Sequence, residues 1–473
     1  MSTFSGFNTG LSGLLSHQRA LEVASNNIAN LNTVGYTRQR AELVSADGAG
    51  RAGLHTGGSI YNGGVNVDAV QRLGDIHLES RVRNHTAESG KLDALAEAWA
   101  AAEATINEPT EKGMAEALAR FFNDFAEVGT QPQSDAARAV LLEDARDLAG
   151  AINTAYTTVN TEWQDARTKA SSLISEVNSA ASQVAALNDR ILTAGIQGTP
   201  TGVLEDERAR LMVELADKIG AESRINDNGS YDVFVGGGSL VQGSRSFDVR
   251  LDGALIMSKA GESVDTGNPQ KTGEVRLTWV ANDRPVHIDG GRLAGYAQAL
   301  APTEKGGILA GMAERYNTLA SDLATTVNGI HEAREFFSVT AGHPAAQSLR
   351  VAITSTADID VRGRDAAGDP IEGAFGSAKA DEISRAGLGR GGVADRWSAQ
   401  VVDVGVQTRS VTRRADAAED TRKNTENALT SKTGVNLDEE VMTLMASQTA
   451  YAGAARVITT VDEMLRTLLA MGA

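Results

Sequence analysis

The stretch FSGFNTGLSGLLSHQRALEVASNNIANL, residues 4–31, decides the fold because its apolar side chains recur every three or four residues. This heptad spacing is typical of a helix that buries one narrow stripe against a partner helix. The stripe consists of Phe4, Phe7, Leu11, Leu14, Leu21 and Ile28, with Gln18 and Ser25 at its two remaining positions.

The other end of the sequence carries a stripe of the same spacing. It consists of Leu437, Val441, Leu444, Tyr451, Ala455, Ile458 and Leu465, with Gln448 and Asp462 as polar members. An isolated amphipathic helix is marginal in water, so we expect the two helices to pair. Periodicity alone leaves open that each stripe packs on its own local domain. We hypothesise that Gln18 and Gln448 pair or set the helix register; alternatively, both face water.

Pairing of the two ends predicts a discontinuous terminal domain that encloses the other domains. We assign residues 1–40 and 435–473 to a terminal coiled-coil domain, 41–75 to an extended β connector, 76–220 with 300–335 and 395–434 to a helical bundle domain, 221–299 to an antiparallel β domain, and 336–394 to a mixed loop and β insert. The predicted fold class is multidomain and mainly α with β: paired N- and C-terminal coiled-coil helices, a long-helix bundle domain and an inserted antiparallel β domain.

Local signals mark the helices and strands. Ser134 is the expected cap of a long helix through about residue 194, Asp395 the cap of a helix that leads to Gly434, and Asn436 with Glu439 a capping box. Alternating patterns between turn residues predict the strands AELVS, SIYN, VNVDAV, SRIN, YDVFV, SLVQ, FDVRL, ALIMS, EVRLTWVA and PVHI.

Composition excludes several classes of partner and several kinds of chemistry. The net charge is −17, with 61 acidic and 44 basic residues, so we expect no nucleic acid to bind. Cysteine is absent, which excludes disulfides and thiol catalysis. No run approaches the ~20 apolar residues that span a bilayer, so we expect no membrane insertion, and the N-terminal stretch lacks the pattern of a cleaved secretory signal.

No motif indicates catalysis, a cofactor or a metal. His331-Glu332 lacks a second histidine four residues after the first, so we interpret His331 as a solvated helix residue. Gly236–Gly238 is interpreted as a β-turn, and Asp438–Glu440 as the acidic first turn of a helix. We therefore expect no catalytic, cofactor-binding or metal-binding residues and no enzyme activity.

Two terminal motifs carry a family resemblance. SNNIANLNTVGYTRQR, residues 25–40, and GVNLDEEVMTLMASQTAYAGAARVITTVDEMLRTLLAMG, residues 434–472, resemble the matching ends of the rod, hook and hook-associated axial proteins of the bacterial flagellum. LEDERARLMVELA, DNGSYDVFVGGGSLVQG and GGRLAGY, which begin at residues 204, 227 and 290, are similar to the hook-associated members. The N-terminal family motif comprises Ser25, Asn26, Asn27, Ile28, Asn30, Asn32, Gly35 and Tyr36. Val34 replaces the proline usual in this motif.

The resemblance implies a secreted structural protein at the hook–filament junction that passes through the flagellar type III export apparatus and polymerises at the distal hook. It implies homo-oligomers, contacts with the hook protein and a second junction protein, and a cytoplasmic export chaperone. The candidate chaperone-binding residues are Val457, Ile458, Val461, Met464, Leu465, Leu468 and Leu469. Three alternatives stay open: a hook or distal-rod protein, a secreted hydrolase whose acidic residues lie in 336–394, and a soluble coiled-coil interaction protein.

Overall fold

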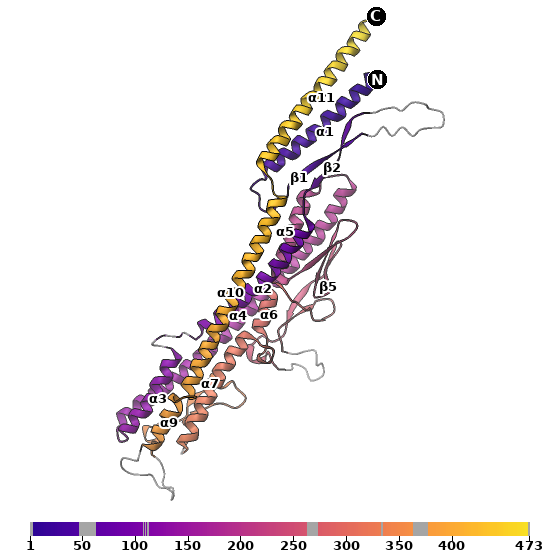
Figure 1. Ribbon diagram of the computed structural model, residues 1–473. Helices are drawn as coiled ribbons and strands as arrows, with labels where there is room; N and C mark the ends of the chain where they lie inside the picture. The colour runs from indigo at the N-terminus through magenta and orange to yellow at the C-terminus, as the bar shows by residue number, and fades with distance from the viewer. Residues whose placement is uncertain are drawn as a thin grey trace.

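The longest helix, α4 (Asp135–Ile196), runs through the body of the molecule. Its 62 residues, at about 1.5 Å of rise each, give a rod of roughly 90 Å. The Ser134 side chain caps it as predicted and accepts a hydrogen bond from the Ala137 N–H at 3.2 Å. The computed structural model describes residues 3–46, 63–106, 108, 110, 113–262, 273–332, 334–362 and 377–471. The molecule is elongated, and both chain termini lie at one end of it (Figure 1).

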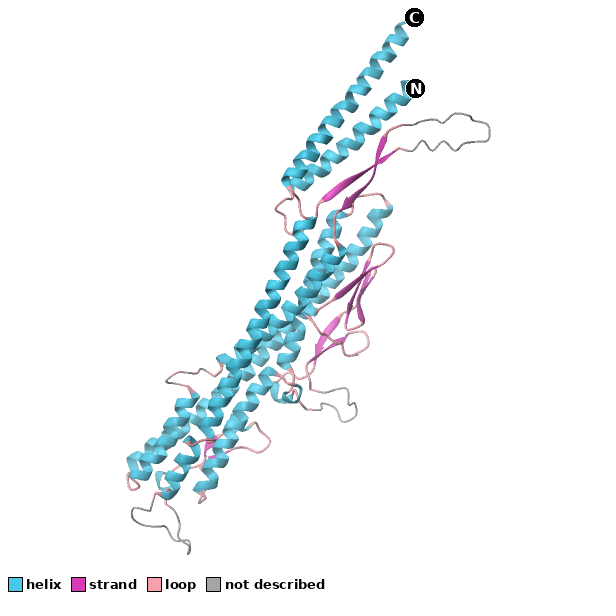
Figure 2. Ribbon diagram, in the orientation of Figure 1, coloured by secondary structure: helices cyan, strands magenta, loops and turns pink. Residues whose placement is uncertain are grey.

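Further helices pack alongside α4 and one another to form the body of the molecule (Figure 2). They are α2 (Ile76–Ala104), α3 (Met114–Thr130), α5 (Gly202–Ile219), α6 (Gly291–Leu300), α7 (Ile308–His331) and α10 (Val393–Thr433). The rings of Tyr316 on α7 and Trp397 on α10 are fully buried, with centroids 5.3 Å apart. Residues 291–299, which the sequence placed in the β domain, belong to α6. This helix packs on α2, with Gly295 against Ala94.

Two small antiparallel sheets lie against α4. One has the order β3 (Glu222–Ile225), β4 (Tyr231–Val235), β5 (Gly238–Gln242) and β6 (Arg245–Ser246); the other pairs β7 (Val249–Asp252) with β8 (Arg276–Trp279). The Asn188 amide of α4 donates hydrogen bonds of 2.8 Å to the carbonyl oxygens of Tyr231 and Gly243. The Asn178 amide donates to the Val249 carbonyl oxygen at 2.9 Å. Asparagines on the long helix therefore anchor both sheets.

Two predicted strands are wrong. ALIMS, residues 254–258, runs into a 3₁₀ helix at Met257–Lys259, because a turn buries the Met257 side chain without strand pairing. In PVHI, only Pro285 contributes a bridge, opposite Thr278. Proline lacks the N–H that a ladder requires.

The described part of the insert is more helical than predicted. β9 (Phe337–Ser338) and β10 (Arg350–Val351) are two-residue strands, whereas α8 (Ala345–Ser348) and α9 (Ala378–Leu388) are helices. Gly387 of α9 lies against the Phe122 ring of α3, where a Cβ would come within 2.2 Å of the ring. The amphipathic pattern of α9 was obscured by the glycines around it. Residues 363–376 lie outside the described residues.

His331 is fully buried, so its interpretation as a solvated residue is wrong. Its Nε2 accepts a hydrogen bond from the Asp360 N–H at 2.8 Å, so the proton of the neutral ring is on Nδ1, which donates to the Arg334 carbonyl oxygen at 2.7 Å. Burial lowers the pKa of His331. The residue links the end of α7 to the insert.

The last two helices begin at different caps. α10 begins at Val393 after the N-cap residue Gly392, so the prediction of Asp395 as the cap is wrong. Asp395 lies within the first turn, and its Oδ2 accepts a hydrogen bond from the Gly391 N–H at 2.8 Å. α11 (Leu437–Met471) follows Asn436, whose Oδ1 accepts from the Asp438 N–H at 3.0 Å. The Asn436 cap agrees with the sequence signal, whereas the Glu439 carboxylate of the predicted capping box pairs with Arg38.

A two-stranded antiparallel hairpin forms the described part of the connector. β1 (Gln39–Ser45) pairs with β2 (Val65–Arg72), with Gln39 opposite Arg72 and a register shift after Glu42. The predicted strands AELVS and VNVDAV fall within these two elements. The predicted strand SIYN, residues 59–62, lies outside the described residues.

Two carboxyl groups face each other between α3 and α4 and predict a pH-dependent stability. Burial, followed by a hydrogen bond and repulsion from Asp144, raises the pKa of Asp124 to about 7. The folded state therefore retains a proton that the unfolded state loses near pH 4, and stability should fall as pH rises from about 4 to 7. In thermal unfolding, Asp124→Asn should flatten this fall, whereas Asp147→Asn on the exposed face of α4 should preserve it. Identical pH profiles for Asp124→Asn and the unmodified protein would contradict the assignment.

Candidate assembly site

The two ends of the chain pair as antiparallel helices. α1 (Thr3–Ala29) and α11 lie side by side beyond the end of the body (Figure 1). Gly6 of α1 lies against Val461, and Gly10 lies against Ile458 and Val457. A Cβ at Gly10 would lie 2.9 Å from Ile458 Cγ1. Glycine thus allows the two backbones to approach closely.

Small residues of α1 lie against α11, next to the predicted stripe. Gly6, Gly10 and Gly13 touch α11, and Asn27 continues this face, one residue before Phe7, Leu11, Leu14 and Ile28 of the predicted stripe. One residue corresponds to a rotation of about 100° around a helix. Phe7 and Leu11 are exposed, and Leu14, Leu21 and Ile28 are half-buried. The larger side chains therefore keep accessible surface.

Another face of α1 binds the β hairpin through hydroxyl groups. Thr9 Oγ1 donates to the Gly63 carbonyl oxygen at 2.6 Å, and Ser16 Oγ donates to the Val65 carbonyl oxygen at 2.7 Å. Ser12 Oγ accepts a hydrogen bond from the Val65 N–H at 3.3 Å. The hairpin is thereby held along the terminal helix pair.

Asn27 is the centre of a polar cluster where the helix pair meets the body. Its amide donates to the Gln39 carbonyl oxygen at 2.8 Å and to Glu440 Oε2 at 3.0 Å. Its Oδ1 accepts from the Tyr36 hydroxyl at 2.8 Å and from the Gln39 N–H at 3.0 Å. Burial, together with the charges of Asp206 and Glu440, raises the pKa of Tyr36 to about 12, which keeps its hydroxyl protonated as a donor. All four hydrogen-bonding sites of the Asn27 amide are used.

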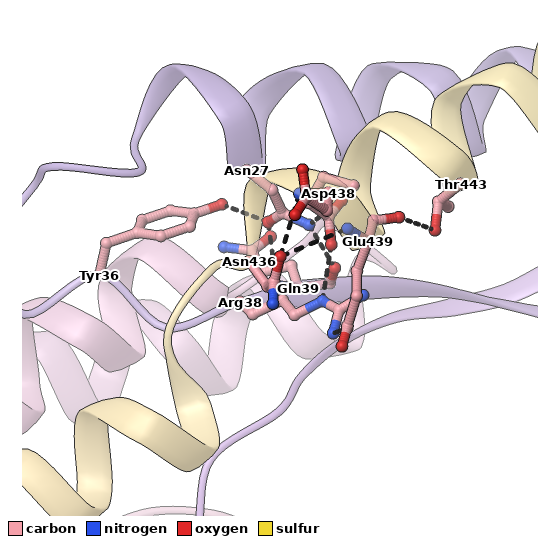
Figure 3. Close-up of polar contacts among 9 residues, drawn as sticks. Asn27, Tyr36, Arg38, Gln39, Asn436, Asp438, Glu439 and Thr443 are labelled. Carbon is pink, nitrogen blue, oxygen red and sulfur yellow. Dashed lines mark hydrogen bonds and ion pairs between the residues drawn. The ribbon is translucent and has the colours of Figure 1, made fainter.

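Arg38 completes this group, which we call the hinge cluster: Asn27, Tyr36, Arg38, Gln39, Glu439 and Glu440. Arg38 Nε and Nη1 each lie 2.6 Å from a carboxylate oxygen, of Glu440 and Glu439 respectively. Figure 3 shows the side chains converging from α1, from the segment before β1 and from the start of α11. The acidic first turn of α11 therefore binds an arginine from the other end of the chain.

A second set of ion pairs attaches the hairpin to the body. Arg72 Nε lies 2.6 Å from Asp206 Oδ1 on α5, and Arg72 Nη1 lies 2.7 Å from Glu79 Oε1 on α2. Lys432 at the end of α10 binds Asp75, the N-cap residue of α2. The pKa of Asp75 is lowered to about 2, chiefly by its hydrogen bond from Lys432.

A cleft of about 500 Å³ lies beside these ion pairs, and we call it the hinge cleft. Its walls are the loop from Leu31 to Thr37, the first turns of α2, the middle of α5 and the end of α10. Gly35 in the loop has a φ of +82°, which favours glycine, and the neighbouring Val34 is almost fully exposed.

Three family profiles match the sequence along its length. "Flagellar hook-associated protein FlgK helical domain" matches residues 99–334, "Flagella basal body rod protein" residues 7–37, and "Flagellar basal body rod FlgEFG protein C-terminal" residues 428–471. Flagellar hook-associated protein 1 of Bacillus subtilis is 25% identical over 499 aligned residues, which cover 98% of this chain and 97% of that protein. The chain belongs to the FlgK family of flagellar hook-associated proteins.

A second relative and a solved structure are also similar to this chain. Flagellar hook-associated protein 1 of Escherichia coli is 31% identical over 240 residues, which cover 50% of this chain and 43% of that protein. The structure of the flagellar hook junction protein FlgK from Burkholderia pseudomallei superimposes with a TM-score of 0.60 at 13% identity, covering 74% of this chain and 99% of that one. This structural likeness supports the mainly α fold with small β sheets.

The structure places the predicted assembly residues of this FlgK-family chain in two groups. Phe7, Leu11, Leu437 and Val441 are exposed; Leu14, Leu21, Ile28, Leu444, Tyr451, Ile458 and Leu465 are half-buried. The side chain of Phe4 lies outside the described residues. Gln18 and Gln448 are both exposed, and the Gln18 amide donates to Glu22 Oε1 at 3.5 Å. The described contacts do not join Gln18 to Gln448.

The predicted family motif contributes one buried side chain and a bonded loop. Asn27 is buried in the hinge cluster, Tyr36 binds it, and Asn30 Nδ2 donates to the Asn26 carbonyl oxygen at 2.9 Å. Ser25, Asn26 and Asn32 are exposed, and Ile28 is half-buried.

The candidate chaperone residues differ in how far they are exposed. Val457, Met464 and Leu469 are exposed, Ile458 and Leu465 are half-buried, and Val461 is buried against Gly6 of α1. The Leu468 side chain lies outside the described residues.

Sequence reasoning missed the glycine face, the ion pairs of Arg38 and Arg72, and the hinge cleft. The spacing of Gly6, Gly10 and Gly13 was the available signal for the first, because small residues at intervals of three and four indicate close helix contact. No sequence signal joined Arg38 to residues about 400 positions away. Among the described residues, no His, Cys, Asp and Glu group of three or more is arranged for a metal ion, and no helix is long and apolar enough to cross a membrane.

Proposed function

We propose that this chain is an exported structural subunit that polymerises at the distal end of the hook and joins hook to filament. The observation that carries the proposal is the pairing of α1 with α11 through small residues, which leaves large apolar side chains exposed on both helices. The exposed set is Phe7, Leu11, Leu15, Leu437, Val441, Met442, Met445, Val457, Met464, Leu469 and Met471.

Neighbouring subunits supply the surface that these side chains lack. Met442 is 71% exposed and Leu469 is 74% exposed. Burial of one such side chain contributes roughly 1.5–3 kcal/mol, so several of them give a large driving force for association. Because the covered state is also the ordered state of the terminal helices, assembly stabilises their folding. The protein then acts as a structural subunit and not as an enzyme.

In the proposed polymer, each subunit has specific neighbours. Copies of this chain contact one another laterally, the hook protein lies on one side of the ring, and a second junction protein lies on the other. The paired helices form the inner layer of the tube, and the body with its β sheets faces outward. This arrangement places the exposed apolar faces between subunits, where they are shielded from water.

Before export, the C-terminal helix is bound by a cytoplasmic chaperone. Because Val461 is buried against Gly6, the chaperone competes with α1 for this residue. Deletion of residues 437–473 should abolish co-purification with the chaperone, and Gly6→Leu, which blocks α1, should preserve or increase it. Unchanged chaperone binding by the truncated chain would overturn this assignment.

A deletion strain tests the function directly. Loss of the protein should leave hooks on the cells, remove the filaments and release flagellin into the medium. Electron microscopy of the cells and immunoblots of the medium measure these outcomes. The alternative role of a hook or distal-rod protein predicts cells without hooks, and that result would replace the junction role.

A further inference from the structure

The hinge cleft contains an arginine that lacks a carboxylate partner. Arg83 of α2 lines the cleft and is only 5% exposed. Within the described part of the chain, its guanidinium has no hydrogen bond and no ion pair. A guanidinium carries five N–H donors, and those of Arg83 have no acceptor among the described residues.

The acidic residues of the cleft are bound to other arginines. Glu79, one helical turn before Arg83, and Asp206 both pair with Arg72, at 2.7 and 2.6 Å. Glu426 pairs with Arg422 at 2.9 Å. The cleft is therefore lined by an excess of positive charge in a chain whose net charge is −17. Burial lowers the pKa of Arg83, and the charge of Glu79 offsets this only in part.

The apolar parts of the cleft suit the stem of an acidic side chain. Leu31 and Val34 lie on the loop side, and Val213 and Leu429 lie on the body side. Val34 is 94% exposed. The cleft is lined by the loop that follows α1 and by Gly434 and Val435, which precede α11, so it lies near the helices that a neighbouring copy covers in the proposed polymer. Such a copy carries 61 acidic and 44 basic residues, so carboxylates outnumber cationic groups on it.

We propose that the hinge cleft receives an aspartate or glutamate carboxylate from a second copy of this chain, which Arg83 binds. This inference rests on the proposed function, because the second copy is the lateral neighbour in the tube. Charge-assisted hydrogen bonds from a guanidinium to a carboxylate are among the strong ones in proteins, and the paired geometry also fixes orientation. The contact sets how the body of one subunit is oriented on the next.

The test replaces Arg83 with methionine and compares it with Arg81→Met, which removes the same charge from an exposed position two residues away. Each variant is expressed in a deletion strain, and its retention on isolated hooks is measured over a range of NaCl concentrations. Arg83→Met should lower retention on the order of tenfold, and Arg81→Met should not change it. The thermal midpoint of the purified Arg83→Met chain should be unchanged or higher, because an unpaired buried charge is removed.

If Arg83 only stabilises the fold, Arg83→Met should lower the thermal midpoint and leave retention on hooks unchanged. That result would overturn the proposal. The amount of each variant secreted by a strain without hooks controls for export.

A photo-crosslinking residue at Val34 identifies the group that occupies the hinge cleft. A crosslinked product of two 49.5 kDa chains, lost in Arg83→Met, is expected. A product with another flagellar protein would refute a second copy as the occupant. If the unmodified protein is not retained on hooks, the proposed function itself fails.

Discussion

Replacement of Gly10 with isoleucine is expected to separate the terminal helices and to abolish filament attachment. A Cβ at Gly10 would lie 2.9 Å from Ile458 Cγ1 and 3.5 Å from the Ala454 carbonyl oxygen, so the larger side chain fits only if α1 moves away. Overpacking of this kind costs about 1–3 kcal/mol at one contact and is repeated in every subunit of a polymer. The number of filaments per cell in a complemented deletion strain measures the effect, and we expect a fall of at least about tenfold.

Gly150 provides the matched control for this substitution. It lies in α4, and a Cβ built on it has no neighbour within 4 Å. Gly150→Ile adds the same side chain to a helix and should leave filament number unchanged. Normal filament numbers in Gly10→Ile cells, with secretion equal to that of Gly150→Ile, would show that close contact of α1 and α11 is not required for assembly.

Replacement of Arg38 with methionine should release the start of α11 from the hairpin. The Glu440 side chain is 2% exposed and would lose an ion pair of 2.6 Å, although it keeps the hydrogen bond from Asn27. Removal of one partner from a buried pair costs about 3 kcal/mol at the lower end of the usual range. Backbone amides of α11 should then exchange with deuterium roughly a hundredfold faster in the purified chain.

Arg40 offers the control for this prediction because it lies two residues away in β1 and is exposed. Arg40→Met should exchange like the unmodified protein. Addition of Glu440→Gln to Arg38→Met should restore part of the protection, because an amide is less costly to bury than an unpaired carboxylate. If Arg38→Met leaves the exchange of α11 unchanged, the hinge cluster does not hold the helix.

Local sequence signals predicted many of the elements. Ser134 marked the start of α4 and Asn436 the start of α11, because a cap acts on the backbone of the next few residues. The alternation of apolar and polar residues between turn residues located β4 and β5, because this pattern is also read from neighbouring residues in the chain. Where a side chain was buried by a turn, as at Met257, or by a distant segment, as at His331, the local pattern was misleading.

The candidate site was only partly predictable. The sequence by itself determined that both ends form helices with stripes of heptad period, and that a loop with Gly35 follows the first helix. The tertiary structure alone decided that a glycine face of α1, next to the stripe of large side chains, lies closely against α11. Both faces have the same period, and the choice depends on how closely two backbones approach. The partners of Asn27 and Arg38 were equally undecided, since a hydrogen bond or ion pair depends on distances in space between residues far apart in the chain.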